Sequence, residues 1–205
     1  MRMMRVLAFL LLATSISRAQ ISTNPDQVVQ VSNLRFHVAR NADATSPLAA
    51  ALETIFRNPD VCCGKDSSLV DMVAAANPLS LQDVAAKLQG RHVLGDGRPV
   101  IIDAEYRAVN PTDGKLPAAT NLLTALNNNQ PLLLEWNSRL YVVYGAVYTE
   151  IVSADENGSR VVLDTIEKLL LFDPVSGKQT AFARITDDWT KVQGTLTATV
   201  KPSSS

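Results

Sequence analysis

Two adjacent cysteines are the most reactive side chains in the sequence. Cys62 and Cys63 are its only cysteines, and Gly64 follows them directly. A thiolate is a strong nucleophile, and the dipole at the start of a helix stabilises it. Because residues 69–76 have helical apolar spacing, we expect Cys63 to open that helix, with Gly64 leaving room for a substrate. A disulfide between the two cysteines in an oxidising compartment is an alternative, and it would block the nucleophile.

A nucleophilic cysteine also needs a base that takes its proton and a group that orients the base. The sequence has two histidines. His37 lies between Phe36 and Val38 in an alternating segment, where we expect it to face solvent. His92 follows the helix expected at 80–89 and is the alternative base, although a loop position without a role in chemistry also fits it.

Three segments, in chain order, resemble papain-like cysteine peptidases, above all the bacterial peptidases that process double-glycine leaders. In that family a cysteine opens a helix, a histidine begins a later strand with a glycine six positions on, and an Asp or Asn follows, often as Asp-Pro. The resemblance spans about residues 46–174. It rests on these matching stretches: Cys63-Gly64 with Ser67-Ser68-Leu69, Arg139 to Gly145, and Asp173-Pro174.

The resemblance implies a papain-like α+β fold in which Cys63, Arg139 and Asp173 share one cleft. Arg139 stands where the family has its histidine base, and Asp173 is the orienting acid. Asn58 lies closest to the place of the oxyanion-hole Gln, and Gly64 would line the same substrate site. A guanidinium stays protonated at any relevant pH, so Arg139 cannot act as a general base.

The function implied is therefore a catalytically impaired cysteine-peptidase-like protein, a peptide-binding pseudoenzyme. The second hypothesis is an active thiol hydrolase or transferase that uses Cys63 with His92, or a thiolate stabilised by Arg139. The third is a structural exported domain without a reactive thiol. We expect no cofactor and no metal, because two cysteines do not make a four-ligand zinc site. A peptide or protein ligand is the expected partner.

The elements that must position these residues fall into two groups. Helical patterns come first and strand patterns later, which predicts an α+β fold with a helical half packed on an antiparallel sheet. Helices are expected at 46–56, 69–76, 80–89 and 117–126, and strands at 100–102, 132–136, 141–148, 161–163, 169–172 and 180–182.

The ends of the chain have their own signals. Residues 1–19 hold Arg2 and Arg5, then a short apolar run and a Ser-Arg-Ala cleavage site, which predicts a signal peptide and a secreted or periplasmic protein that starts at Gln20. We expect an extended arm at 20–45, a papain-like domain at 46–192 and a tail at 193–205. A net charge of −1 excludes the basic surface of a nucleic-acid-binding protein, and no second apolar span follows.

Overall fold

The computed structural model describes residues 20–39, 47–58, 61–63, 65–76, 80–109, 119–154 and 160–203. The predicted signal peptide, Gly64 and the expected hairpin turn at 157–158 lie outside the described residues. In the described part of the chain, no helix is long and apolar enough to cross a membrane.

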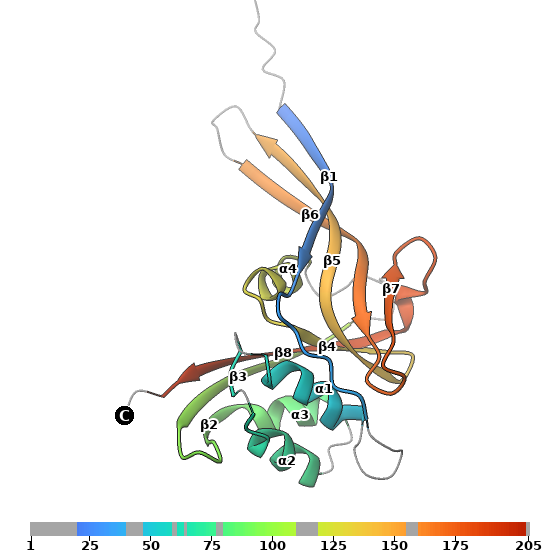
Figure 1. Ribbon diagram of the computed structural model, residues 1–205. Coiled ribbons are helices and arrows are strands. Elements are labelled where there is room, and N and C mark those ends of the chain that lie inside the picture. Colours follow the sequence, from blue (N-terminus) through green and yellow to red (C-terminus); the bar gives the residue numbers. More distant parts are fainter. Residues whose placement is uncertain are drawn as a thin grey trace, which may run out of the picture.

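One eight-stranded sheet, antiparallel throughout, organises the protein (Figure 1). β1 (Gln20–Gln30) lies beside the second part of β5, on the edge whose first part pairs with β4. The other strands lie in the order β2 (Gly90–Val93), β3 (Pro99–Ala108), β8 (Val192–Pro202), β4 (Leu132–Trp136), β5 (Arg139–Ala154), β6 (Arg160–Phe172) and β7 (Gln179–Ala183).

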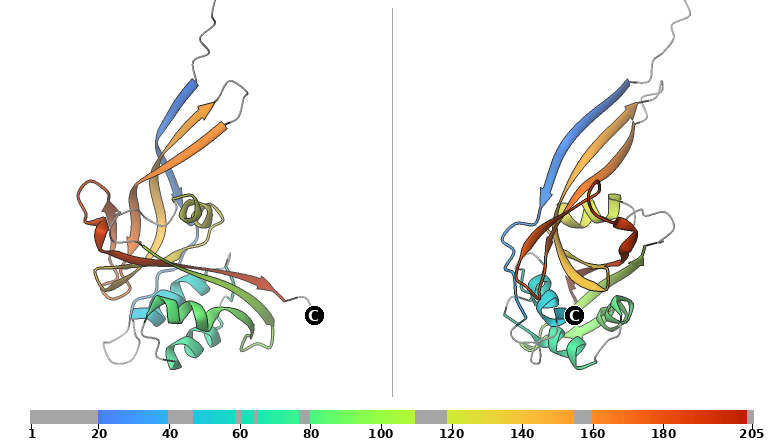
Figure 2. Two further views of the ribbon diagram at one scale, coloured as in Figure 1. Left: turned by 180° about the vertical axis from the view of Figure 1, so that it is seen from behind. Right: turned by 90° about the vertical axis from the view of Figure 1, so that its right-hand side faces the viewer.

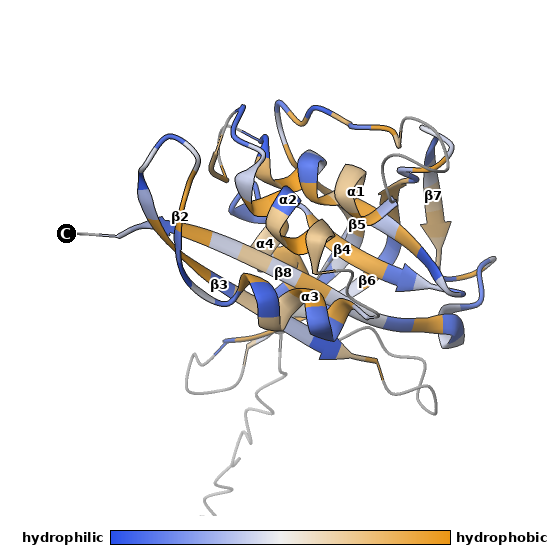
Figure 3. Cartoon of the chain, turned by 90° about the horizontal axis from the view of Figure 1, so that it is seen from below, coloured by the Kyte–Doolittle hydropathy of each residue, from blue (hydrophilic) through white to orange (hydrophobic). Residues whose placement is uncertain are grey.

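Helices cover both faces of this sheet. α1 (Pro47–Phe56), α2 (Ser68–Ala75) and α3 (Leu81–Leu88) pack on one face, and Figure 3 shows them lying over the central strands. α4 (Ala119–Asn127) packs on the opposite face. α3 begins as its sequence predicts, because the Ser80 hydroxyl accepts a hydrogen bond of 3.1 Å from the Asp83 N–H. A short 3₁₀ helix, Trp189–Lys191, precedes β8.

Alternation along the strands divides the core into two layers. Leu133 and Val142 point to the α1–α3 layer, while Leu132, Leu134 and Val143 point to the α4 layer. All five are at most 1% exposed. Central strands buried on both faces therefore read as continuous apolar runs rather than as alternating patterns.

The α+β prediction with an antiparallel sheet is confirmed, but the division into helices first and strands later is incomplete. β1, β2 and β3 come from the first half and join the same sheet. The tail predicted at 193–205 is wrong for most of its length, because β8 runs through it between β3 and β4. Leu196 and Ala198 of that strand are buried core residues.

Gly145 marks a close approach of three strands. A Cβ on this residue would lie 2.9 Å from the Val29 carbonyl oxygen of β1 and 2.9 Å from a Leu170 methyl of β6. The Val29 contact is with backbone, which cannot rotate away. Gly145 therefore lets β1 pack against the middle of β5.

We expect Gly145→Ala to lower the free energy of unfolding by about 1–3 kcal/mol through overpacking. Urea unfolding followed by circular dichroism measures the change. Ser153→Ala, on the outer part of the same strand, is the control, with an expected effect within about 0.5 kcal/mol. Equal stability of Gly145→Ala and wild type would mean that the two strands do not approach this closely.

Candidate functional site

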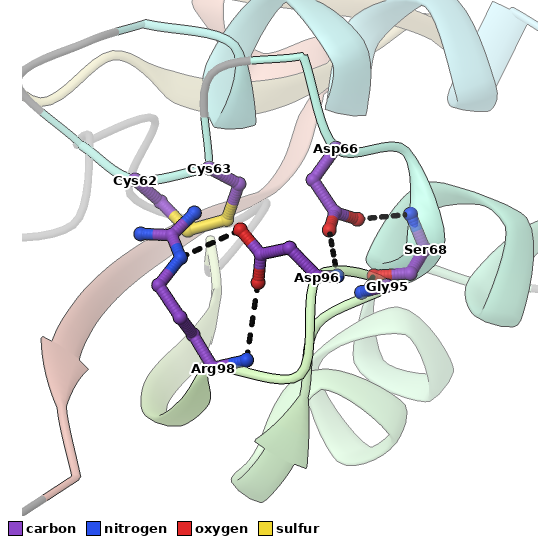
Figure 4. The surroundings of a disulfide bond; sticks show 7 residues. All are labelled: Cys62, Cys63, Asp66, Ser68, Gly95, Asp96 and Arg98. Atoms are coloured by element: carbon purple, nitrogen blue, oxygen red, sulfur yellow. Dashed lines mark hydrogen bonds and ion pairs between the residues drawn. A yellow bond between two sulfur atoms is a disulfide. The ribbon is translucent and has the colours of Figure 1, made fainter.

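Cys62 and Cys63 are joined by a disulfide in the loop between α1 and α2 (Figure 4). α2 begins at Ser68, so the prediction that Cys63 opens a helix is wrong. Cys63 is 4% exposed and belongs to the apolar cluster under α1–α3. Of the open alternatives for the cysteine pair, the structure takes the disulfide, and the sulfur of Cys63 is neither a thiolate nor accessible.

Hydrogen bonds tie the loop after the disulfide to the turn before β3. The Asp66 carboxylate accepts bonds from the Ser68 N–H at 2.8 Å and the Asp96 N–H at 3.3 Å. The Gly95 N–H donates to the Ser68 hydroxyl at 3.1 Å. Hydrogen bonds from the side chain and N–H of Ser68 lower the pKa of Asp66, and so do those from the Gly95–Asp96 turn, against the effect of burial. Asp66 and Ser68 therefore join the loop between α1 and α2 to the turn between β2 and β3.

Arg139 and Asp173 come together as expected. An Arg139 Nη2 lies 2.8 Å from an Asp173 carboxylate oxygen, across 34 residues of sequence. The guanidinium carbon lies 5.7 Å from the centre of the Tyr141 ring, which adds a cation–π contact. The turn between β4 and β5 directs Arg139 there, and its two residues, Asn137 and Ser138, both have positive φ.

Asp173 organises the turn between β6 and β7. Its carboxylate accepts hydrogen bonds from the Val175 N–H at 2.9 Å, the Ser176 N–H at 3.3 Å and the Ser176 hydroxyl at 2.8 Å. Burial raises the pKa of Asp173, but the Ser176 and Val175 hydrogen bonds and the charge of Arg139 outweigh it and hold the pKa below its usual value. The Asp-Pro stretch thus has a complete structural role as a turn.

Among the described residues, no hydrogen bond, ion pair or disulfide joins Cys63 to this ion pair, and the common cleft expected for Cys63, Arg139 and Asp173 stays a prediction. Residues 139 and 141 point to the same side of β5, and Tyr141 belongs to the α4 layer. Cys63 belongs to the α1–α3 layer on the other side of the sheet. Arg139 also lines a pocket with Leu48 of α1 and Leu81 and Val84 of α3, so its side chain is not confined to the α4 layer.

The remaining predicted site residues also have other partners. Asn58 is fully buried, and its Nδ2 donates to the Asn129 carbonyl at 3.3 Å, so its amide serves packing rather than an oxyanion hole. The His92 ring lies 2.8 Å from the carbonyl oxygen of Leu88, the last residue of α3. The other histidine, His37, has its Nδ1 3.2 Å from a Glu53 carboxylate oxygen.

A polar cleft, which the sequence did not predict, lies between α4 and the strands β3 and β8. It encloses about 240 Å³. Its floor is a row of threonine side chains on β8, with Thr199 donating to the Gln130 side chain at 3.3 Å. Glu105 and Arg107 form an ion pair of 2.8 Å at its side. The principal polar lining residues are Glu105, Arg107, Asn121, Asn128, Gln130, Thr195, Thr197 and Thr199.

A signal for this cleft is present in the sequence. Hydroxyl residues alternate with apolar ones from Thr195 to Val200, which is the period of a half-buried strand. Local pattern alone does not show that this stretch is a central strand, because residues on its partner strand are more than 80 positions away. Only the pairing of β3 with β8 places the threonines beside Arg107 and Glu105.

No cluster of three or more His, Cys, Asp or Glu suited to a metal ion occurs among the described residues. No family model, curated protein or solved structure matches the chain. A function for this chain is therefore inferred from the disulfide, the Arg139–Asp173 ion pair and the polar cleft.

We expect Asp173→Asn to lower the free energy of unfolding by about 2 kcal/mol at neutral pH, because an amide cannot accept all of these bonds. Since the pKa of Asp173 is lowered in the folded protein, its contribution is full above the unfolded value of about 3.9 and is lost as the pH falls through the folded value. The gap between wild type and variant should therefore close only in acid. Urea unfolding at several pH values measures it.

Asp71→Asn is the matched control, because this exposed carboxylate accepts one hydrogen bond, from the Ser67 hydroxyl at 2.8 Å. Its effect should be small. A gap for Asp173→Asn that stays constant down to strong acid would contradict the argument.

Proposed function

We propose that the chain is an exported, catalytically inactive protein related to papain-like cysteine peptidases, which binds peptides instead of cleaving them. One observation carries the loss of catalysis: the Cys63 sulfur is bonded to Cys62 and buried. A disulfide also favours an oxidising compartment, which supports export.

The chemistry of peptide cleavage needs more than a sulfur. A thiolate must attack the amide, and a neighbouring acid must return a proton to the leaving amine. Arg139 cannot do this, and its guanidinium is held by Asp173 and Tyr141. His92 is bonded to the Leu88 carbonyl. The active-hydrolase hypothesis therefore has less support than the binding hypothesis.

The polar cleft beside α4 is the place where we propose that a peptide binds. Its threonine hydroxyls and side-chain amides both donate and accept hydrogen bonds, as the amide groups of a peptide backbone require. The one ion pair of the cleft, Arg107 with Glu105, has no net charge. A neutral lining of this kind suits an uncharged polar backbone better than a phosphate or a nucleic acid.

The loss of catalysis is tested by thiol labelling together with turnover of a generic peptide substrate. Without reductant, we expect no labelling by iodoacetamide and no turnover. After mild reduction Cys62 should be labelled before Cys63, because Cys63 is 4% exposed. Without reductant, Arg139→His should create no activity, because the Cys63 sulfur stays bonded to Cys62.

Cys62→Ser is the informative control, because it frees the Cys63 thiol without changing its neighbours. We expect it to have no peptidase activity. Turnover by this variant that disappears when Cys63 is also changed to Ser would overturn the proposal and show a peptidase blocked by its disulfide.

The position of the peptide site is tested with a phage-displayed random peptide library. We expect selected peptides to bind the wild-type chain, and to lose affinity about tenfold or more for Thr197→Trp, which fills the cleft and removes a hydroxyl. Thr180→Trp, on exposed β7, is the matched control. Peptides that bind both variants equally would place the site elsewhere, and the absence of any selected peptide would favour a structural domain.

A further inference from the structure

The outer parts of three strands form an arm that leaves the body of the protein. It consists of residues 20–24 of β1, 150–154 of β5 and 160–164 of β6. Figures 1 and 2 show this arm projecting beyond the helices in all three views. Nothing in the described structure covers either of its faces at the outer end.

The arm exposes large apolar side chains in an unusual run. Val161, Val162 and Leu163 follow one another on β6 and are 55%, 51% and 59% exposed. Ile21, 69% exposed, lies in the same cross-strand row as Val161, with Ser153 between them. Alternation puts Val161 and Leu163 on one face and Val162 on the other. Consecutive exposed apolar residues on a strand mark an interaction site more often than a solvated surface.

The backbone of β6 is also unpaired along this run. β7 pairs with β6 only from Lys168 to Phe172, so among the described strands β6 has no neighbour on its outer edge over residues 160–166. The opposite edge of the arm, on β1, is interrupted by Pro25 and by Asp26 with φ of 55° within a register shift. Proline and bulges of this kind protect an edge from pairing. The β6 edge has no such protection.

The charges on the β6 edge are incomplete within one chain. Arg160 makes no ion pair with any described residue. Asp164 lies directly across from Glu150, and like charges in this position are unfavourable. Burial and then the charge of Glu150 raise the pKa of Asp164. The β6 edge thus carries a cation, Arg160, without an anionic partner, and an anion, Asp164, without a cationic partner.

We propose that this edge pairs with the same edge of a second copy, antiparallel, about a two-fold axis at Val162. The axis is perpendicular to the sheet, so each residue and its symmetry mate point to the same face. Two residues that lie opposite each other must also point to the same face, and their numbers therefore add to an even sum. Val162 then faces the Val162 of the second copy, and Val161 faces Leu163. Arg160 faces Asp164 at both ends, so each copy supplies the cation that the other lacks.

Neighbouring symmetric registers lack this match. An axis at Val161 would put Arg160 opposite Val162, and an axis at Leu163 would put it opposite Ile166. An axis at Asp164 would bring Arg160 to Lys168, whose edge already pairs with β7. The charge and apolar pattern of the strand is therefore self-complementary about Val162 alone.

Sedimentation analysis of the purified chain over a concentration series tests the association. We expect a monomer–dimer equilibrium whose dissociation constant rises about tenfold or more in Val162→Lys, because two like charges meet on the axis. Ile185→Lys, at a residue that is 91% exposed and off the arm, is the matched control and should leave it unchanged. Unfolding curves check that both variants are folded.

A charge exchange tests the register. Arg160→Glu alone and Asp164→Arg alone should each weaken the dimer, and the double variant should restore it. Val162→Cys should also form an intermolecular disulfide, because directly opposed residues have Cβ atoms about 4.5–5.5 Å apart. Leu163→Cys should not, because its symmetry mate is diagonal, at about 7–8 Å.

A chain that is monomeric throughout the series, or a dimer that Val162→Lys does not weaken, would overturn the proposal. A dimer in which Leu163→Cys cross-links better than Val162→Cys would overturn the register and with it the pairing of Arg160 with Asp164. This inference goes beyond peptide binding and does not need it. Thr197→Trp should leave the dimer intact, so failure of one proposal is distinguishable from failure of the other.

Discussion

Burial of both faces of one antiparallel sheet is the constraint on which the rest of this structure depends. The central strands β4 and β5 carry apolar side chains on both sides, so two separate layers must cover them. Helices α1–α3 form one layer, and α4 forms the other. Each loop that could hold a reactive group is then fixed to one layer or the other.

Within this division, Cys63, Arg139 and Asp173 each have partners other than those of a catalytic centre. The loop that contains Cys63 lies in the α1–α3 layer, and the Cys63 sulfur forms a disulfide there. The residues after Cys63 bond this loop to the Gly95–Asp96 turn. Arg139 stands at the start of a strand, and the direction of its side chain is set by alternation. The Asp173 carboxylate pairs with the Arg139 guanidinium and also accepts hydrogen bonds within its own turn. Both side chains therefore have partners that serve the structure.

The same sheet leaves two regions unsatisfied, and these regions are the basis of both proposals. Where α4 and β8 meet, polar side chains line a cleft instead of closing it. At the outer end of β6, backbone groups, apolar side chains and one arginine are left without partners in the described chain. An ion pair whose groups have all their partners, together with two surfaces that lack partners, fits a protein that works by binding. The cleft beside α4 suits a short peptide, whereas the outer edge of β6 suits a second folded chain.

By itself, the sequence determined the helices and most of the strands, because caps, turns and apolar periods are local. Ser80 begins a helix through its own hydroxyl, and the apolar run after Pro131 makes a buried strand wherever the chain carries it. Tertiary structure alone decided which side chains meet, since partners such as Arg139 with Asp173 or Glu105 with Thr197 lie far apart in the chain. The expected tail is instead the central strand β8. A strand with one polar face is stable only when other strands pair with it, and the local sequence does not show which strands these are.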